Sequence, residues 1–510
     1  MNPRRLFLAL LLPLLGFRLW LAVALPISGD EAYFIWWGRI PDWGFYDHPP
    51  MIGWWLAAQL HLGSAAWWLR LTSVLQPLLL GTVVAWSVPH IWPRADEERR
   101  WWAALFTMIA PASVWNVFIT TDTPLVYFSV LSGLAWLRAR RDDDLHWYLI
   151  SGVLLAGAVL SKYFVVFLGF AYLLDVLAAS RQRSWAGLAI VYACCVPALA
   201  LMVWWNVGHC WPNYMFNFVN RNEDAGLSWK TPLLYAVMMV YLLTPTLALG
   251  LLRPFRQAAG EWHGSARAAP AEVRSLTLLA FVPLAMFGLL SLVKTIGLHW
   301  VLSFLPFAFM LLALALPLPT LARMGKFVVL FAALHVAAAA AISMTSLETW
   351  QRTKWYDGIV LTFAAGEIAA LLKSYETDYV FMSNGYSDAV TLGYNAGRYF
   401  GVFGEASSHA RHDDIVTDFR QLDGRNILIL RKTAPAPGEY APYFRELKVE
   451  TFALRGVTFY KVLGRGFDYV HYRDTVLATI KRKYYALPSW LLVHGCYFCD
   501  RYFPGQSCQR

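Results

Sequence analysis

The residues best suited to chemistry lie in one polar segment that follows the first apolar run of the chain. The segment Ser28–Pro50 reads SGDEAYFIWWGRIPDWGFYDHPP and contains the acidic pair 30–31, the acidic stretch 42–47, His48 and two prolines. Aromatic side chains fill the positions between them, as is typical of the interface between membrane and water. Carboxylates held beside rigid turns at such an interface indicate a site.

Asp30 and Glu31 are the first candidates for catalysis. A carboxylate at the outer edge of a membrane span can act as a general base when a substrate hydroxyl comes within hydrogen-bond reach. The alternative is a helix start, because Ser28 is a good capping residue and acidic side chains favour the first helical turn. Both interpretations stay open at this point.

Asp47 and His48 directly precede Pro49 and Pro50. The prolines stiffen the backbone and keep the residue before them out of the α region, so His48 is presented on a fixed extended turn. Beside an anionic ligand, a protonated His48 would donate a hydrogen bond. The alternative is an interfacial turn that starts the helix from Met51 onward.

Four more polar residues lie between or beside apolar runs: Asp122, Lys162, Lys294 and His299. Asp122 stands in the sequence TTDTP, which reads locally as a helix start. The lysines are costly at membrane depth, where ionisable groups usually face the protein interior or a substrate, although long side chains also reach back to the interface. Cations that converge on one cavity would suit a lipid-linked phosphate.

The composition is that of a membrane protein. Of the 510 residues, 58% are hydrophobic and 15% are charged, whereas a soluble domain carries about 25% charged residues. The segment Leu6–Ile27 is too long for the core of a signal peptide and is interpreted as the first span. The net charge of +10 comes mostly from arginines in short loops, without a basic stripe for nucleic acid.

Apolar runs predict about eleven membrane spans. They lie near 6–27, 66–90, 101–119, 123–138, 146–161, 163–180, 185–206, 231–252, 274–293, 299–317 and 326–345. With the amino terminus inside, every arginine-rich loop falls on the inner side and every unusual polar segment on the outer side. We therefore expect a transmembrane catalytic domain at 1–345 and an outer domain at 346–510.

The tail from residue 346 changes character. An amphipathic helix at 359–373 is followed by strands at 379–382, 426–430 and 458–462, separated by polar loops. Helices and strands that alternate in this way predict a small α/β domain.

Six cysteines occur in the chain. Cys194 and Cys195 lie in an apolar run and are interpreted as small buried residues, and Cys210 lies in an outer loop. The carboxyl-terminal segment contains His494, Cys496, Cys499 and Cys508. Three thiolates and an imidazole would form a zinc site, and the alternative is a disulfide with one thiol left over. Neither interpretation places catalysis there.

Five motifs occur in a recognisable order: DEAYF with YDHPP, then TTDTPL, LSKY, WN with a following histidine, and K with a following HW. Over roughly residues 1–320 the chain resembles bacterial GT-C glycosyltransferases of the family 39/83 type. That superfamily includes lipid A 4-amino-4-deoxy-L-arabinose transferase and the protein O-mannosyltransferases. The lipid A transferase has Glu-Lys where this chain has Asp47-His48.

The resemblance implies a polytopic helical enzyme that takes a sugar from a polyprenyl-phosphate donor at the outer, periplasmic face of the bacterial inner membrane. Asp30 would be the general base, with Glu31 shaping the same pocket, and the reaction would invert the anomeric carbon. The donor phosphate and sugar would contact the remaining candidates, which are Asp47, His48, Asp122, Lys162, Lys294 and His299.

The expected partners are the donor, a lipid, glycan or protein acceptor, and membrane lipids, with no nucleic acid. No Gly-rich phosphate motif occurs, and no cofactor is required. A divalent metal shared by Asp30, Asp47 and Asp122 stays open. Two other functions also stay open. One is that of a protein O-mannosyltransferase-like enzyme, and the other is that of a transporter or flippase for a lipid-linked sugar, which predicts repeated halves that this sequence lacks.

Overall fold

The computed structural model describes residues 1–222, 225–252, 271–406 and 412–509. The chain divides into two compact units. The helical unit comprises Met1–Leu25, Gly63–Ala200 and Ala225–Ser343. The α/β unit comprises Pro26–Leu62, Leu201–Asp224 and Met344–Arg510, so it contains two segments from the first half of the chain besides the tail.

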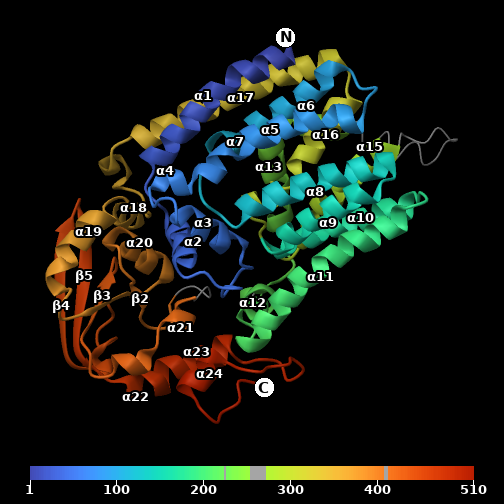
Figure 1. The fold of residues 1–510 in the computed structure, drawn as a ribbon. Coiled ribbons are helices and arrows are strands. Elements are labelled where there is room, and N and C mark those ends of the chain that lie inside the picture. Colours follow the sequence, from blue (N-terminus) through green and yellow to red (C-terminus); the bar gives the residue numbers. More distant parts are fainter. Residues whose placement is uncertain (223–224, 253–270, 407–411, 510) are drawn as a thin grey trace. The chain divides into compact units, whose positions relative to one another are not determined.

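Apolar helices make up the helical unit (Figure 1). Its core is formed by buried leucines, valines, alanines and aromatic rings from nearly all of these helices. The helices are α1 (Pro3–Ala24), α4 (Ala66–Leu69), α5 (Leu71–Ile91), α6 (Glu97–Ile109), α7 (Pro111–Trp115), α8 (Asp122–Asp142), α9 (Leu145–Val159), α10 (Val166–Ala178), α11 (Ser184–Gly208), α13 (Lys230–Leu243), α15 (Ala271–Leu290), α16 (Leu305–Ala315) and α17 (Leu318–Met344).

A helix lies at each of the predicted spans, but several are short. Five described helices are long and apolar enough to cross a membrane, or up to seven if each of two bent pairs is one span. The five are Pro3–Ala24, Ala66–Ile91, Ser184–Gly208, Val273–Leu290 and Leu318–Met344. The expected number of about eleven is higher, because helices such as Leu145–Val159 and Leu305–Ala315 have fewer than 18 residues.

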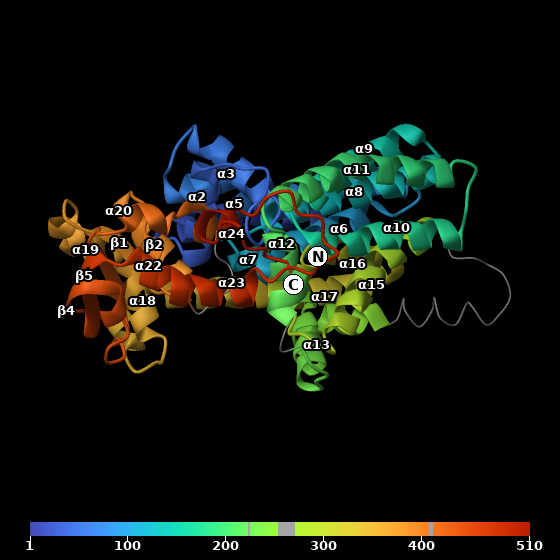
Figure 2. The ribbon, with the colours of Figure 1, turned by 90° about the horizontal axis from the view of Figure 1, so that it is seen from below.

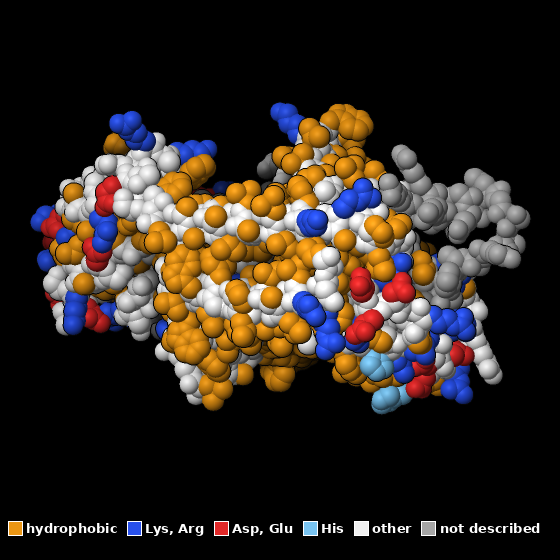
Figure 3. Space-filling view, turned by 90° about the horizontal axis from the view of Figure 1, so that it is seen from above, with side chains coloured by type: hydrophobic (Ala, Val, Ile, Leu, Met, Phe, Trp, Pro, Cys, Tyr) orange, Lys and Arg blue, Asp and Glu red, His pale blue; other side chains and the backbone are white. Residues whose placement is uncertain are grey.

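The surface of the helical unit fits contact with lipid. Hydrophobic side chains cover much of the face drawn in Figure 3. On α1 and α17, Leu12 and Leu330 are each 70% exposed, and Leu8 and Leu334 are also exposed. Water would disfavour such a surface, so a bilayer is its natural solvent. The protein is therefore a multi-pass membrane protein.

A buried polar network ties four helices together at Asp175 of α10. Its carboxylate accepts hydrogen bonds from Arg140 Nε at 2.9 Å, Trp136 Nε1 at 2.9 Å and Ser275 Oγ at 2.7 Å. Arg140 also donates to Ser184 of α11. Because Asp175 and Arg140 are both buried, each charge depends on the other for its stability.

The α/β unit is built on a five-stranded sheet in the order β2-β1-β3-β5-β4 (Figures 1 and 2). The strands are β1 (Val380–Ser383), β2 (Gly401–Val402), β3 (Ile427–Arg431), β4 (Phe444–Leu454) and β5 (Val457–Phe467). The helices are α2 (Gly29–Arg39), α3 (Met51–Leu60), α12 (Pro212–Tyr214), α18 (Tyr356–Phe363), α19 (Ala365–Leu372), α20 (Tyr386–Ala396), α21 (Asp413–Val416), α22 (Tyr469–Tyr472), α23 (Ala478–Tyr484) and α24 (Tyr497–Tyr502).

Helices cover both faces of this sheet, and the strand sequences explain why. Alternate residues of a strand point to opposite faces. Leu428 and Leu430 of β3 pack with α18, α19 and α20, whereas Ile427 and Ile429 pack with aromatic residues of α22 to α24. β1, β2 and β3 run parallel, and β5 is antiparallel to both β3 and β4.

The predicted α/β tail is confirmed, with two strands that the sequence analysis missed. The predicted strands correspond to β1, β3 and β5. The prediction missed β2, which has two residues, and β4, which lies at the edge of the sheet with mostly exposed side chains. An edge strand with charged residues carries little hydrophobic signal. β4 and β5 are joined through Arg455 and Gly456, which both have positive φ, as a tight hairpin requires.

We expect removal of the Asp175 carboxylate to destabilise the helical unit. In the variant Asp175→Ala the buried Arg140 is left without its carboxylate, a change that typically costs about 3–5 kcal/mol. Asp142→Ala, which breaks a more exposed pair with Arg138, should cost about 1 kcal/mol or less. Thermal unfolding in detergent measures the difference. Equal shifts in the two variants would contradict the structural role of Asp175.

Candidate functional site

In the helical unit, three of the predicted site residues form one cluster at the start of α8: Asp122, Lys162 and His299. Lys162 Nζ lies 2.7 Å from Asp122 Oδ2, and both side chains are buried. His299 Nε2 lies 3.6 Å from the same oxygen, and the His299 side chain is 46% exposed. Residues that are widely separated in the sequence therefore form one cluster with a solvent-facing edge.

Aromatic rings surround the lysine of this cluster. Lys162 Nζ lies 5.8 Å from the ring centroid of Phe164 and 5.9 Å from that of Trp300. A cation over aromatic faces retains favourable electrostatic contacts where water is scarce. The carboxylate and the rings therefore hold the Lys162 ammonium group in position.

Hydrogen bonds to the neighbouring Thr123 position Asp122. Gln76 Nε2 donates to the backbone oxygen of Thr123 at 2.8 Å, and the hydroxyls of Ser73 and Thr123 lie 3.0 Å apart. The buried Arg18 donates to the backbone oxygens of Ser73 at 2.5 Å and Asn116 at 2.8 Å. These bonds join α1 and α5 to the segment that leads into α8.

The structure does not support the capping interpretation of Asp122. The N-cap residue of α8 is Thr121, and no side chain makes the capping hydrogen bond there. The carboxylate instead contacts Lys162, and its Oδ1 atom has no hydrogen-bond partner among the described residues. Lys294 lies half-buried just after α15, and its place in the phosphate site stays a prediction.

In the α/β unit, Asp30 and Glu31 take different roles at the start of α2. Glu31 is fully buried and forms a capping box, because its Oε2 accepts from Ser28 N at 3.0 Å and its own N donates to Ser28 Oγ. Asp30 is exposed, and its Oδ1 accepts a hydrogen bond from Tyr386 Oη at 3.1 Å. Glu31 therefore caps the helix, as the alternative interpretation expected, and Asp30 is the carboxylate that a substrate could reach.

Asp47 and His48 lie on a tight turn, as the prolines suggested. Phe45 N donates to the backbone oxygen of His48 at 3.1 Å, and Asn217 Nδ2 donates to the backbone oxygen of Asp47 at 2.8 Å. Asp47 is 6% exposed, with its Oδ2 at 3.3 Å from His48 Nδ1. Asp47 Oδ1 has no hydrogen-bond partner among the described residues, which leaves one buried oxygen for a ligand.

Two residues near these carboxylates, Tyr386 and His412, were not found from the sequence as site residues, and Arg221 also lies near them. Burial, followed by the negative charges of Asp30 and Asp47, raises the pKa of Tyr386 well above its usual value. Burial lowers the pKa of Arg221, while the Asp47 charge opposes that shift. His412 N donates to Tyr33 Oη at 3.1 Å. Tyr386 and His412 belong to the tail, so no local spacing connects them with α2.

The carboxyl-terminal cysteines form disulfides in the structure. Cys210 pairs with Cys496, and Cys499 pairs with Cys508. The thiol that the predicted single disulfide leaves over, Cys496, is thus paired with Cys210 in the segment after α11. Cys194 and Cys195 are free. Sulfurs of Cys210, Cys496 and Cys508 lie within 4.8 Å of one another, but sulfurs in disulfides are not thiolate ligands. His494 is not part of that cluster.

Comparisons with known proteins agree with the resemblance. A family model described as dolichyl-phosphate-mannose-protein mannosyltransferase matches residues 47–205. The lipid A galacturonosyltransferase RgtD of Rhizobium johnstonii is 29% identical over 208 residues, which are 39% of this chain. The match covers 43% of that relative's length.

Two solved structures are also similar. ArnT from Cupriavidus metallidurans, solved with bound undecaprenyl phosphate, superposes with a TM-score of 0.61 at 15% identity and covers 90% of this chain and 97% of its own. The oligosaccharyltransferase of Archaeoglobus fulgidus gives a TM-score of 0.46 at 14% identity, covering 84% of this chain and 69% of its own. The ArnT match confirms the expected fold. The family model and the relative RgtD, together with that fold, confirm the resemblance to the GT-C superfamily.

The disulfides predict a definite number of reactive thiols. Under denaturing conditions with a chelator and without reductant, we expect maleimide to label two cysteines, Cys194 and Cys195, and with reductant all six. Mass spectrometry of the labelled protein counts them. Six labelled cysteines without reductant would instead support the zinc alternative, because chelation frees metal-bound thiolates.

The burial of the His412 imidazole predicts that the stability of the protein depends on pH. Burial lowers its pKa to about 4, although Asp47 and Asp42 oppose the shift, and its Nδ1 accepts a hydrogen bond from Tyr46 N. In the unfolded chain a histidine binds a proton below about pH 6.5, whereas the buried His412 stays neutral down to about pH 4. The free energy of unfolding is therefore highest above about pH 6.5 and falls as the pH drops toward 4. At pH 5 the free energy of unfolding is lower by about 2 kcal/mol than at neutral pH.

The variant His412→Gln keeps an acceptor but does not titrate. Its melting temperature in detergent should therefore fall less between pH 7.5 and pH 5 than that of the wild type. His471→Gln, at an exposed position, serves as the control and should follow the wild type. A His412→Gln variant with the full wild-type pH dependence would show that His412 is not held neutral.

Proposed function

We propose that this chain, a membrane protein of the GT-C type, is a glycosyltransferase that moves a sugar from a polyprenyl-phosphate donor to a lipid or glycan acceptor. The observation that supports this most is the pair of polar clusters, one with an exposed carboxylate and one with a buried, charge-paired lysine. An acceptor hydroxyl needs a base, and a phosphate leaving group needs positive charge.

Asp30 is the proposed base. Its carboxylate lies on the first turn of α2, open to solvent, and Tyr386 holds one of its oxygens. Glu31 could act as the base in place of Asp30 only if the capping box opened, because the Glu31 carboxylate is hydrogen-bonded to the backbone of Ser28. Glu31 then acts as a positioning residue that fixes the helix start on which Asp30 stands.

The cationic side chains are proposed to bind the donor phosphate. Lys162, which is paired with Asp122, and the more exposed His299 would bind the phosphate of the donor. Asp47 and His48 would contact the donor sugar and phosphate, where a protonated imidazole donates a hydrogen bond. Lys294 is proposed as an additional phosphate contact.

The reaction balances as a single displacement. The acceptor oxygen attacks the anomeric carbon, a new carbon–oxygen bond forms, and the bond from that carbon to the phosphate oxygen breaks. Asp30 takes the hydroxyl proton, and polyprenyl phosphate leaves with the electron pair. One displacement inverts the anomeric carbon, and the leaving phosphate needs little protonation, so a second carboxylate is not required.

A divalent metal is a further proposal. The Oδ1 atoms of Asp47 and Asp122, each without a hydrogen-bond partner among the described residues, are hard oxygen ligands of the kind that divalent cations prefer. A cation on either carboxylate would neutralise charge on the phosphate. No step of the displacement depends on it.

We also propose the outer, periplasmic face of the bacterial inner membrane as the place of reaction. The arginine-rich loops of the sequence favour that orientation, and disulfides persist in such an oxidising compartment. The acceptor named for the relative RgtD, lipid A, favours a lipid acceptor. The description of the matching family model favours a protein acceptor as the second candidate.

Release of polyprenyl phosphate tests the function. Purified wild type and Asp30→Asn are incubated with a lipid extract that contains polyprenyl-phosphate sugars, and mass spectrometry follows free polyprenyl phosphate. Loss of a general base slows a reaction by about 100-fold to 10,000-fold. Glu446→Gln, an exposed carboxylate of β4, is the matched control and should release at the wild-type rate.

Two results would contradict the proposal. Release by Asp30→Asn at the wild-type rate, with donor binding intact, would remove Asp30 as the base. If no variant released polyprenyl phosphate while the wild type moved the donor across vesicles, the chain would be a transporter.

A further inference from the structure

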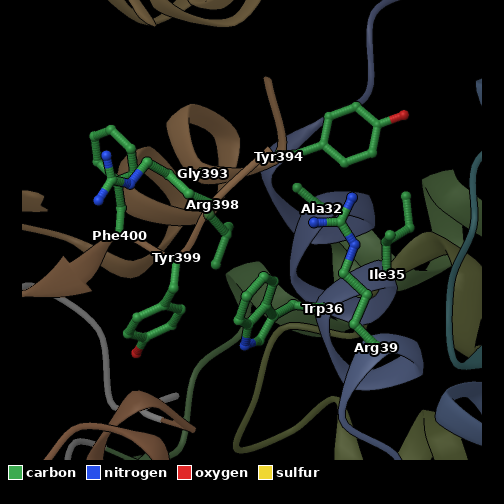
Figure 4. A pocket seen from close by; sticks show the side chains of 10 residues that line it. Ala32, Ile35, Trp36, Arg39, Gly393, Tyr394, Arg398, Tyr399 and Phe400 are labelled. Atoms are coloured by element: carbon green, nitrogen blue, oxygen red, sulfur yellow. The ribbon is translucent and has the colours of Figure 1, made fainter. Parts of the chain in front are cut away.

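Aromatic side chains of the α/β unit are placed in two different ways. Between α2 and the segment after α20, Trp36 faces Tyr399 with ring centroids 5.1 Å apart, so the two rings shield each other (Figure 4). At the carboxyl-terminal segment, by contrast, Trp490 is 70% exposed and Leu492 is 62% exposed. A single exposed apolar side chain needs no explanation, but a continuous group of them marks a contact surface.

Rings from the segment after α11 extend this exposed group. The ring centroid of Trp490 lies 6.1 Å from that of Tyr214. Tyr214 in turn lies 5.3 Å from the ring of Phe218, which is 55% exposed, and 6.0 Å from the ring of Trp211. These four residues and Leu492 form one continuous group, which we call the aromatic surface.

Hydrogen bonds and a disulfide hold the two halves of the aromatic surface together. Trp211 Nε1 donates to the backbone oxygen of Leu492 at 2.7 Å. His494 N donates to the backbone oxygen of Val207, in the last turn of α11, at 3.1 Å. The disulfide of Cys210 closes the same junction, and the carboxyl-terminal loop lies beside this end of α11 in Figure 1. The carboxyl-terminal segment is therefore fixed to the end of that helix.

The end of α11 determines where the aromatic surface lies in relation to a membrane. α11 (Ser184–Gly208) is one of the helices that are long and apolar enough to cross a bilayer, and Trp204 near its end is 62% exposed. Trp211 follows the last residue of α11 by three residues, which span at most about 10 Å. The aromatic surface therefore lies close to the boundary between membrane and water.

The residue types of the aromatic surface match that boundary. Trp and Tyr are enriched there because their rings combine an apolar body with a polar edge. Phe218 and Leu492 add side chains without polar groups, which acyl chains accommodate better than water does. The stretches 210–219 and 485–493, which carry the surface, contain no charged residue. Nothing in them would attract a charged partner, so uncharged lipid chains fit the surface better.

We propose that the aromatic surface inserts into the lipid interface beside α11 and anchors the carboxyl-terminal segment of the α/β unit to the membrane. Trp490 and Leu492 contact the acyl chains next to the headgroups, and the disulfide of Cys210 ties this anchor to a membrane span. The anchor does not rest on the proposed function, because none of its residues belongs to the candidate sites.

Photocrosslinking of the full-length protein tests the anchor. Benzoylphenylalanine, which reacts with nearby C–H bonds on illumination, replaces Trp490 or Phe218. As the matched control it replaces Val449, an exposed apolar residue of β4 in the same unit, and as the positive control it replaces Leu330 of α17. Each purified protein is illuminated in nanodiscs of phosphatidylethanolamine and phosphatidylglycerol. Mass spectrometry of the intact protein measures the fraction that gains the mass of one lipid.

We expect the probe at Trp490 and the probe at Phe218 to give lipid adducts in at least fivefold higher yield than the probe at Val449. Their yields should approach that of the probe at Leu330, whose side chain faces outward on an apolar helix. Two positions from distant parts of the sequence then report the same lipid contact.

A yield at Trp490 no higher than at Val449 would overturn the anchor. Adducts at Phe218 without adducts at Trp490 would place only the segment after α11 in lipid and would also reject it. A covalent dimer formed through position 490 would assign the surface to a second copy of the chain instead of lipid. None of these measurements requires release of polyprenyl phosphate, so the anchor and the proposed function fail separately.

Discussion

The ion pair between Lys162 and Asp122 is the interaction on which the proposed phosphate site in the helical unit depends. Both side chains are buried, and a single charge left alone in such a place would cost several kcal/mol. The pair can persist because Thr123 beside it is held from α5, and because aromatic rings flank the ammonium group. Under the proposed function, a lysine fixed in this way would meet the donor phosphate without rearrangement, which is the condition for electrostatic catalysis.

In the α/β unit the corresponding constraint is the start of α2. Two adjacent carboxylates meet different surroundings there: Glu31 closes the capping box and is buried, while Asp30 faces solvent and Tyr386. The turn with Asp47 is held by asparagines of the segment Leu201–Asp224. The disulfide between Cys210 and Cys496 ties that segment to the end of the chain. The candidate base, its hydrogen-bond donor and the turn with Asp47 thus depend on segments from three parts of the sequence.

The sequence could predict the features that have a signal in neighbouring residues. Apolar runs located the helices, a short apolar run between polar loops located β3, and polar interruptions located Asp122, Lys162 and His299. The prediction from the sequence did not place the breaks that divide runs into short helices, although the break between α6 and α7 has a local signal, because Ala110 directly precedes Pro111. Tyr386 and the partner of Cys496 were missed because each makes its contact with a distant segment of the chain, which no spacing records.

The stereochemistry of transfer tests the central claim most directly. A polyprenyl-phosphate sugar of known anomeric configuration is supplied to the purified protein with its acceptor, and nuclear magnetic resonance of the product gives the configuration of the new glycosidic bond. A single displacement with Asp30 as base predicts inversion. Retention would require a covalent intermediate on the protein and a second displacement, and it would contradict the account.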